Sequence, residues 1–276
     1  MEKQFKDIVL VPTDFSEISE NAVKYAGELA EHLGYGLAIV HVKENKQDES
    51  KKLHASGRSI EEKGKVKVKY LLKDGDAYKQ IPESAVEIKA NLIVLGTHGK
   101  KGLEHIFGSH AMKIITKAPC PSIVIRDEKF DGGYKDIVFP ISDYMESRQM
   151  VRWAVHIAKV FNSKIHIYKQ SHKDTDLRKR IEIISDQVKE AFEKTEVQYD
   201  INESEDSSNY IEQVLDFSKN TGADLIMVMT KPGIFEQDFN LHKWDEKLMY
   251  SGAGIPVMCI NPLELGDVHY QYVGMI

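Results

Sequence analysis

Short apolar runs alternate along the chain with longer segments whose apolar residues recur at helical spacing. Residues 92–95, Leu-Ile-Val-Leu, are apolar on both faces, as a strand buried inside a parallel sheet requires. Residues 19–33 instead place their apolar positions on one face of a helix. Alternating strands and helices imply right-handed βαβ crossovers. The pattern predicts an α/β protein with doubly wound, mainly parallel sheets, and its first five strands are expected at residues 7–12, 37–42, 65–72, 92–96 and 122–126.

Two charged stretches add detail to this prediction. Residues 65–69 alternate lysine with valine, which is typical of a half-exposed strand near a sheet edge, where lysines discourage unwanted pairing. A nucleic-acid patch is the alternative interpretation of the same lysines. Residues 171–205 are predicted to form a long amphipathic helix, a strand and an acidic loop on a solvated face.

The chain repeats its own pattern once. Several short motifs occur twice in the same order, namely residues 6–9 with 135–138, 90–95 with 223–228, and 121–125 with 256–260. A turn-forming stretch at residues 131–133 precedes the second copy. We therefore predict two repeated domains, residues 1–130 and 131–276, each with a five-stranded, mainly parallel sheet and flanking helices.

Composition narrows the class of protein. The 276 residues are 42% hydrophobic and 29% charged, which fits two globular domains better than disorder or a fibre. The net charge of −6 hides a difference, because residues 1–130 hold 21 basic and 19 acidic residues whereas residues 131–276 hold 16 and 24. This balance argues against nucleic acid as a partner, and no apolar run is long enough to span a membrane. Two cysteines and an N-terminus without a secretory signal predict a cytoplasmic protein.

The most informative stretch, residues 96–109, joins a buried strand to a helix predicted at residues 109–117. It reads Gly-Thr-His-Gly-Lys-Lys-Gly-Leu-Glu-His-Ile-Phe-Gly-Ser. Glycines let backbone N–H groups approach a phosphate, a helix N-terminus favours negative charge, and ligands of open α/β sheets bind outside the carboxyl ends of the strands. The stretch contains neither a P-loop nor a G-x-G-x-x-G motif. The residues alone therefore leave two interpretations open, a phosphate loop or a tight turn followed by a helix that Ser109 caps.

Four motifs together resemble the universal stress protein family. They are Val-Pro-Thr-Asp-Phe-Ser at residues 11–16, His-Val at residues 41–42, the glycine stretch at residues 96–109 and Ala-Pro-Cys-Pro at residues 118–121. The resemblance covers nearly the whole first half, and the second half is similar to a degenerate copy. It implies a tandem universal stress protein that acts in the stress response and binds ATP, or its products ADP or AMP, in the first half.

The resemblance also assigns residues to this expected adenine-nucleotide site. Pro12, Thr13 and Asp14 would border the nucleoside, and the backbone of Val42 would meet the adenine. The residues expected around the phosphates are Gly96, Thr97, His98, Gly99, Gly108, Ser109 and His110. The segment between the second and last of these glycines is one residue shorter than in the family pattern, which is expected to tighten the loop.

Two metal interpretations accompany this site. Asp14 could hold a magnesium ion together with the phosphates, or it could cap the first helix or orient the ribose. His98, His105 and His110 crowd one stretch and could ligate zinc, although their spacing is irregular and no cysteine accompanies them. The simpler interpretation of these histidines is that they lie on the surface and at the start of a helix.

The second copy has lost the glycine stretch. Residues 229–232, Met-Thr-Lys-Pro, stand opposite residues 96–99, and a methionine there would fill space that a nucleotide needs. Proline also lacks the N–H that could donate to a phosphate. We therefore expect one nucleotide site per chain. We also expect Gly96→Met, which copies the second half, to abolish binding while leaving the fold intact.

The second half is expected to serve as a built-in dimer partner. Its last strand, residues 257–260, is predicted to pair with the strand at residues 123–125, and two chains are expected to associate further as a homodimer. Two other functions stay open. One is a slow ATPase or nucleotidyl transferase that uses Lys100, Lys101 or His98, and the other is a nucleotide-free interaction scaffold.

Overall fold

The computed structural model describes residues 7–43, 48–97, 108–230 and 254–262. In the first half the elements are β1 (Ile8–Pro12), α1 (Glu17–Leu33), β2 (Gly36–Lys43), α2 (Ser50–Lys63), β3 (Val68–Asp74), α3 (Ala77–Glu87), β4 (Leu92–Gly96), α4 (Gly108–Ile115) and β5 (Ser122–Ile125). In the second half they are β6 (Asp136–Ile141), the 3₁₀ helix η1 (Met145–Met150), α5 (Val151–Phe161), β7 (Lys164–Lys169), α6 (Thr175–Lys194), β8 (Gln198–Glu203), α7 (Tyr210–Thr221), β9 (Leu225–Met229) and β10 (Val257–Ile260).

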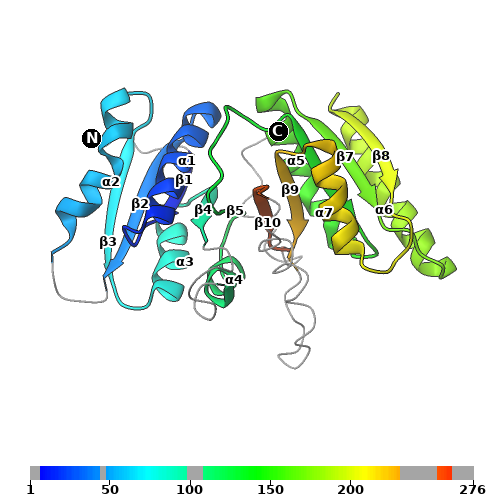
Figure 1. Cartoon of the computed structure of the whole chain (residues 1–276), viewed down its shortest axis with the longest axis horizontal. Helices are drawn as coiled ribbons and strands as arrows, with labels where there is room; N and C mark the ends of the chain where they lie inside the picture. The colour runs from blue at the N-terminus through cyan, green and yellow to red at the C-terminus, as the bar shows by residue number, and fades with distance from the viewer. Residues whose placement is uncertain (1–6, 44–47, 98–107, 231–253, 263–276) are drawn as a thin grey trace.

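The strands of the described residues form one sheet in the order β3-β2-β1-β4-β5-β10-β9-β6-β7-β8 (Figure 1). Neighbouring strands within each half are parallel. β5 and β10 are antiparallel, with Val124 opposite Val257 and Ile123 opposite Met258. The predicted α/β class and the predicted pairing of the last strands of the two halves are therefore confirmed.

The charged stretches fold largely as predicted. β3 lies at an edge of the sheet, but it begins at Val68 and not at residue 65. The lysine–valine alternation overestimates the strand because Gly64 ends α2 with a φ of 68° and Lys65 turns back to form an ion pair with Glu31 of α1, at 2.6 Å. In the second half, α6 and the edge strand β8 confirm the amphipathic helix and the strand that residues 171–205 predict.

The two halves share a mirrored strand order, since β3-β2-β1-β4-β5 is followed by the reverse of the corresponding order, β10-β9-β6-β7-β8. Gly36 N donates to Asp7 O, and Lys164 N donates to Lys135 O, so both members of the second pair lie 128 positions after those of the first. The sequence repeat, which matched Asp7 with Asp136, is therefore wrong by one residue in the first strand, because backbone pairing and not side-chain identity sets the register. The division into two domains near residue 131 stays a prediction.

Helices cover both faces of the sheet (Figure 1). One face packs against α1, α2, α5 and α6, which contribute buried residues such as Leu29 and Ile184. The other face packs against α3, α4 and α7, which contribute residues such as Ile81 and Val214. Because each fully buried side chain of this size stabilises the fold by about 1.5–3 kcal/mol, these two layers hold the strand ends in fixed positions.

Gly96 ends β4 at a point where α1 passes very close. A Cβ atom at this position would lie 2.9 Å from the backbone oxygen of Ile18 and 3.1 Å from the Cβ of Ala22. A backbone oxygen cannot give way without moving α1 itself. The expectation that Gly96→Met leaves the fold intact stays a prediction, but this close packing indicates that the substitution costs stability.

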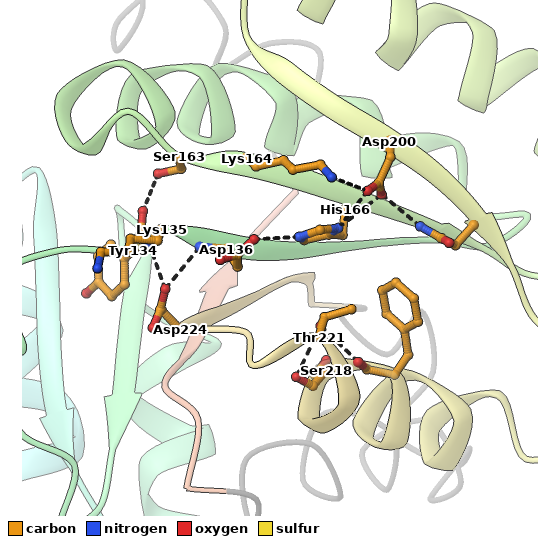
Figure 2. Close-up of polar contacts among 12 residues, drawn as sticks. Tyr134, Lys135, Asp136, Ser163, Lys164, His166, Asp200, Ser218, Thr221 and Asp224 are labelled. Carbon is orange, nitrogen blue, oxygen red and sulfur yellow. Dashed lines mark hydrogen bonds and ion pairs between the residues drawn. The ribbon is translucent and has the colours of Figure 1, made fainter.

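A polar network joins β6, β7 and β8 near their amino ends (Figure 2). His166 is buried, with Nε2 2.8 Å from Asp136 Oδ1 and Nδ1 3.0 Å from Asp200 Oδ1. Lys164 adds an ion pair with Asp200 at 2.7 Å. Burial raises the pKa of the Asp200 carboxyl, but hydrogen bonds from Lys164 and His166 outweigh burial, so the pKa is lowered.

Substituting Gly96 is expected to lower stability. Gly96→Ala and Gly96→Met should both reduce the free energy of unfolding, by about 1–3 kcal/mol with the larger loss for methionine, because the new side chain overpacks against α1. Urea unfolding of the two variants and the wild type measures this. Wild-type stability for Gly96→Met would contradict the packing role.

Asp200→Asn is expected to remove a pH-dependent contribution to stability. Because the folded pKa of Asp200 lies below the ordinary value of 3.8, its contribution is fully present above that pH and is lost as the pH falls through the folded pKa. Solvent screens these partly exposed ion pairs, so the variant should lose at most about 1 kcal/mol at pH 7. Urea unfolding at several pH values should show the difference between variant and wild type shrinking under acidic conditions. A stability difference between variant and wild type that does not change with pH would contradict this role of the Asp200 carboxylate.

Candidate functional site

The carboxyl ends of β1, β2 and β4 bring several of the predicted site residues to one edge of the sheet. β1 lies between β2 and β4, so residues 12–14, Val42 and Gly96 lie at or just after the carboxyl ends of neighbouring parallel strands. This edge is where open α/β sheets bind ligands. α4 begins at Gly108, and Ser109 and His110 belong to its first turn. His98, Gly99 and His105 lie outside the described residues.

Thr13 holds the turn between β1 and α1. Its N–H donates to Val40 O at 2.9 Å, and its buried hydroxyl donates to Glu20 Oε1 at 3.0 Å. The same hydroxyl oxygen accepts the N–H of Phe15 at 3.0 Å and lies 3.1 Å from the hydroxyl of Ser19. The side chain of Thr13 thus points into the turn. The backbone of the turn, and not this side chain, lies at the carboxyl ends of the strands.

Asp14 is the exposed carboxylate of this turn. Its Oδ1 accepts the N–H of Ser16 at 3.0 Å, and Ser16 is the N-cap of α1, with its hydroxyl accepting from Ser19 N. The interpretation that Asp14 itself caps the first helix is therefore wrong, because Asp14 braces the capping residue instead. Partial burial raises the pKa of Asp14, but hydrogen bonds from Ser16 and Ser19 outweigh it and the pKa is lowered. The carboxylate is consequently ionised at neutral pH.

Sequence reasoning named His41 as part of a motif but did not place it among the site residues. It is 7% exposed, and its Nδ1 lies 2.7 Å from the carbonyl oxygen of Thr13. Its Nε2 lies 2.7 Å from Glu49 Oε2, next to an ion pair between Glu49 and Lys52 at 3.2 Å. Hydrogen bonds from His41 and then Lys52 lower the pKa of Glu49. A polar residue inside the otherwise apolar run of β2 is the signal that could have found it.

Two aromatic contacts complete the surroundings of His41. The ring of Phe15 packs on it with centroids 4.3 Å apart, and Lys52 Nζ lies 5.6 Å from the Phe15 centroid. Phe15 has a φ of 65°, a left-handed backbone conformation that turns the chain away from β2. The turn after β1 therefore leaves the sheet sharply at this residue.

Val42 lies on β2 opposite Lys73 of β3. Successive residues of a strand direct their backbone groups to opposite neighbouring strands, so residues two positions apart face the same neighbour. The C=O of Val40 faces β1 because it accepts from Thr13 N. The N–H and C=O of Val42 therefore also face the β1 side, beyond the point where β1 has ended. In the part of the chain that the structure describes, neither group has a hydrogen-bond partner on that side.

Thr97 follows β4 and is buried. Its N–H donates to Ile125 O at 2.8 Å, and its hydroxyl lies 3.3 Å from the same oxygen. Thr230 makes the equivalent pair of contacts with Ile260 O, at 2.9 and 3.2 Å. The two threonines therefore extend the sheet by one step after β4 and β9, and Met229 occupies the position of Gly96.

The second half has a cavity of about 200 Å³ at the carboxyl ends of β6 and β9. It is lined by Pro140, Ser142, Asp143, Tyr144, Ser147, Met150, Gln170, Tyr210, Val228 and Met229. Met229 is 5% exposed and lines this cavity, and the expectation that it fills space a nucleotide needs stays a prediction. Lys231 and Pro232, the last two residues of the Met-Thr-Lys-Pro stretch, lie outside the described residues.

Among the described residues, no group of three or more histidine, cysteine, aspartate or glutamate side chains is placed to hold a metal ion. The zinc interpretation rests on His98 and His105, which are not among those residues, and so it is not tested. Among the described helices, none is both long enough and apolar enough to cross a membrane.

Comparison with known proteins identifies relatives of this chain. A family model described as the universal stress protein family matches residues 6–126. A universal stress protein of Methanocaldococcus jannaschii is 33% identical over 151 residues, which are 46% of this chain and 86% of that protein. A universal stress protein of Thermus aquaticus is 31% identical over 137 residues, which are 44% of this chain and 99% of that protein.

One solved structure extends the likeness to the whole fold. The crystal structure of a universal stress protein from Archaeoglobus fulgidus superposes with a TM-score of 0.71 at 15% identity, and the match covers 93% of this chain and 98% of that chain. At this identity it supports the arrangement of helices and strands alone. The two sequence relatives, of which this chain covers 86% and 99%, show that the chain belongs to the universal stress protein family.

Proposed function

We propose that the first half of this chain binds one adenine nucleotide, ATP or its products ADP or AMP, and that the protein acts as a regulatory protein in the stress response. The observation that carries the proposal is the open backbone of Val42, which faces the space beyond the end of β1. An N–H and a C=O presented side by side match the acceptor N1 and the donor amine N6 of adenine. Guanine presents the opposite order of donor and acceptor, so this edge would select adenine.

The other parts of a nucleotide have suitable partners nearby. An ionised Asp14 accepts hydrogen bonds, which suits the ribose hydroxyls. The N-terminus of α4 follows the glycine stretch and favours phosphate charge. A magnesium ion would need one or two carboxylates besides the phosphates. Because Asp14 already accepts from Ser16 N, we assign its carboxylate to the turn and the ribose and assign no magnesium site.

The second half supports the first without binding a nucleotide in this proposal. It repeats the strand order of the first half, which supports a degenerate second domain over residues 131–276. Met229 occupies the position of the glycine that α1 requires in the first half. Pairing of β5 with β10 gives it the role of a built-in partner, and two chains would associate further as a homodimer in the cytoplasm.

Analysis of the nucleotide content tests the function directly. Protein purified without added nucleotide is denatured, and the small molecules that it releases are separated and identified. The protein is then refolded without nucleotide and titrated with ATP, ADP and AMP by calorimetry. We expect close to one adenine nucleotide per chain. Absence of both release and binding would favour the interaction scaffold. Phosphate release faster than roughly 1 per second would favour the ATPase, because that rate lies in the usual range of enzymes.

Val42→Pro is expected to weaken adenine recognition without removing a hydrogen bond of the sheet. Proline has no N–H, and the N–H of Val42 faces the open side. Gln170→Pro is the matched control, because Gln170 N donates to Ile141 O at 2.8 Å in the second half. We expect Val42→Pro to weaken ATP binding roughly tenfold with little change in Tm. Gln170→Pro should lower Tm and keep the affinity, and the reverse outcome would contradict the site.

A further inference from the structure

We propose that His41 is a positioning residue that keeps the backbone of Val42 open to the base, by holding the carbonyl of Thr13 out of the β1–β2 ladder. The proposal rests on the proposed nucleotide site, and the second half of the same chain is its internal control. In a parallel ladder, the bond after Thr13 N to Val40 O would run from Val42 N to Thr13 O. That bond is not formed in the first half, because His41 Nδ1 donates to Thr13 O at 2.7 Å.

The ladder of the second half continues where that of the first half stops. With the offset of 128, Gln170 corresponds to Val42 and Ile141 to Thr13, and Gln170 N donates to Ile141 O at 2.8 Å. The residue in the place of His41 is Lys169, which forms ion pairs with Glu182 at 2.6 Å and Glu203 at 3.3 Å and leaves the carbonyl to the backbone. The two ladders therefore differ at the residue before the last one, which is His41 before Val42 in the first half and Lys169 before Gln170 in the second.

The next backbone group that could pair with Val42 is the N–H of Phe15, and a second side chain accepts its hydrogen bond. Continuing the ladder would also require Phe15 N to donate to Val42 O, but Phe15 N donates to the hydroxyl of Thr13 at 3.0 Å. Isoleucine at position 141 has no hydroxyl and cannot do the same. Both ladder partners of Val42 are thus satisfied by side chains, one from His41 and one from Thr13, which leaves the donor and the acceptor of Val42 facing the site.

The orientation of His41 is fixed from every side that the structure describes. Nδ1 must be the donor toward Thr13, since a carbonyl only accepts. Nε2 faces the ionised Glu49, which Lys52 holds in place, and the ring packs on Phe15. The imidazole therefore cannot turn away from Thr13 without losing the contact with Glu49.

Amide hydrogen exchange tests the role of His41 without any ligand. Val42 N–H should exchange quickly in the wild type, and it should become protected in His41→Leu, where Thr13 O is free to accept it. His41→Asn keeps a donor nitrogen at the distance of Nδ1 along the side chain and should restore fast exchange. A protected Val42 amide in the wild type would overturn the proposal even if His41→Leu fails to fold. So would equally fast exchange in a folded His41→Leu.

Nucleotide binding tests the consequence for the base. His41→Leu should weaken ATP binding about three- to tenfold and lower the preference for ATP over GTP, whereas His41→Asn should restore both. Lys169→Leu is the matched control in the second half and should change neither. A ratio of ATP to GTP affinity that His41→Leu leaves unchanged would overturn the proposal. A wild type that binds neither nucleotide would refute the proposed function, while the exchange experiment would still decide the role of His41.

Discussion

The hydrogen-bonded ladder between β1 and β2 stops at Thr13, whereas the equivalent ladder between β6 and β7 continues by one more bond, from Gln170 N to Ile141 O. Every backbone group near a strand end has to find a partner in the sheet, in a side chain or in solvent or ligand. The bond that ends a ladder therefore decides which groups a ligand can reach. In the first half, His41 and Thr13 take over this pairing with their side chains, and the open edge of Val42 follows from that exchange.

Antiparallel pairing of β5 with β10 gives the second half a structural role that needs no ligand. β5 is fully buried, and without β10 it would present unpaired backbone groups at an apolar edge, which invites association. Other contacts tie the halves together beside this pair. The amide of Asn261 donates to Ile115 O at 2.6 Å at the end of α4, and the hydroxyls of Tyr25 and Tyr134 lie 2.8 Å apart. The second half thereby supports the helix that begins at the end of the glycine stretch.

The sequence predicted the strands well wherever burial is uniform. Residues 92–96 were predicted as a strand and form β4, because an apolar run of this kind has few alternatives inside an α/β fold. The start of β3 was missed because a lysine–valine alternation continues through a loop in which Lys65 has an ion-pair partner on α1. The role of His41 could not be predicted, because its partners Thr13 and Glu49 lie at sequence distances that only the folded sheet brings together.

Glycine at position 96 shows why a motif does not reveal its physical reason. A glycine between a strand and a loop can allow close approach of a phosphate, a left-handed turn or close packing, and the sequence alone does not distinguish these three reasons. Here the packing of α1 against β4 requires it. At the same place the second half has Met229, and the residues that correspond to the first turn of α1 form the 3₁₀ helix η1. A 3₁₀ helix is narrower and rises further per residue, so it leaves room for a methionine and for the cavity beside it. The lost glycine and the altered helix therefore belong to one change. Restoring the geometry of the first half in the second would require a different backbone in η1 as well as a smaller residue at position 229.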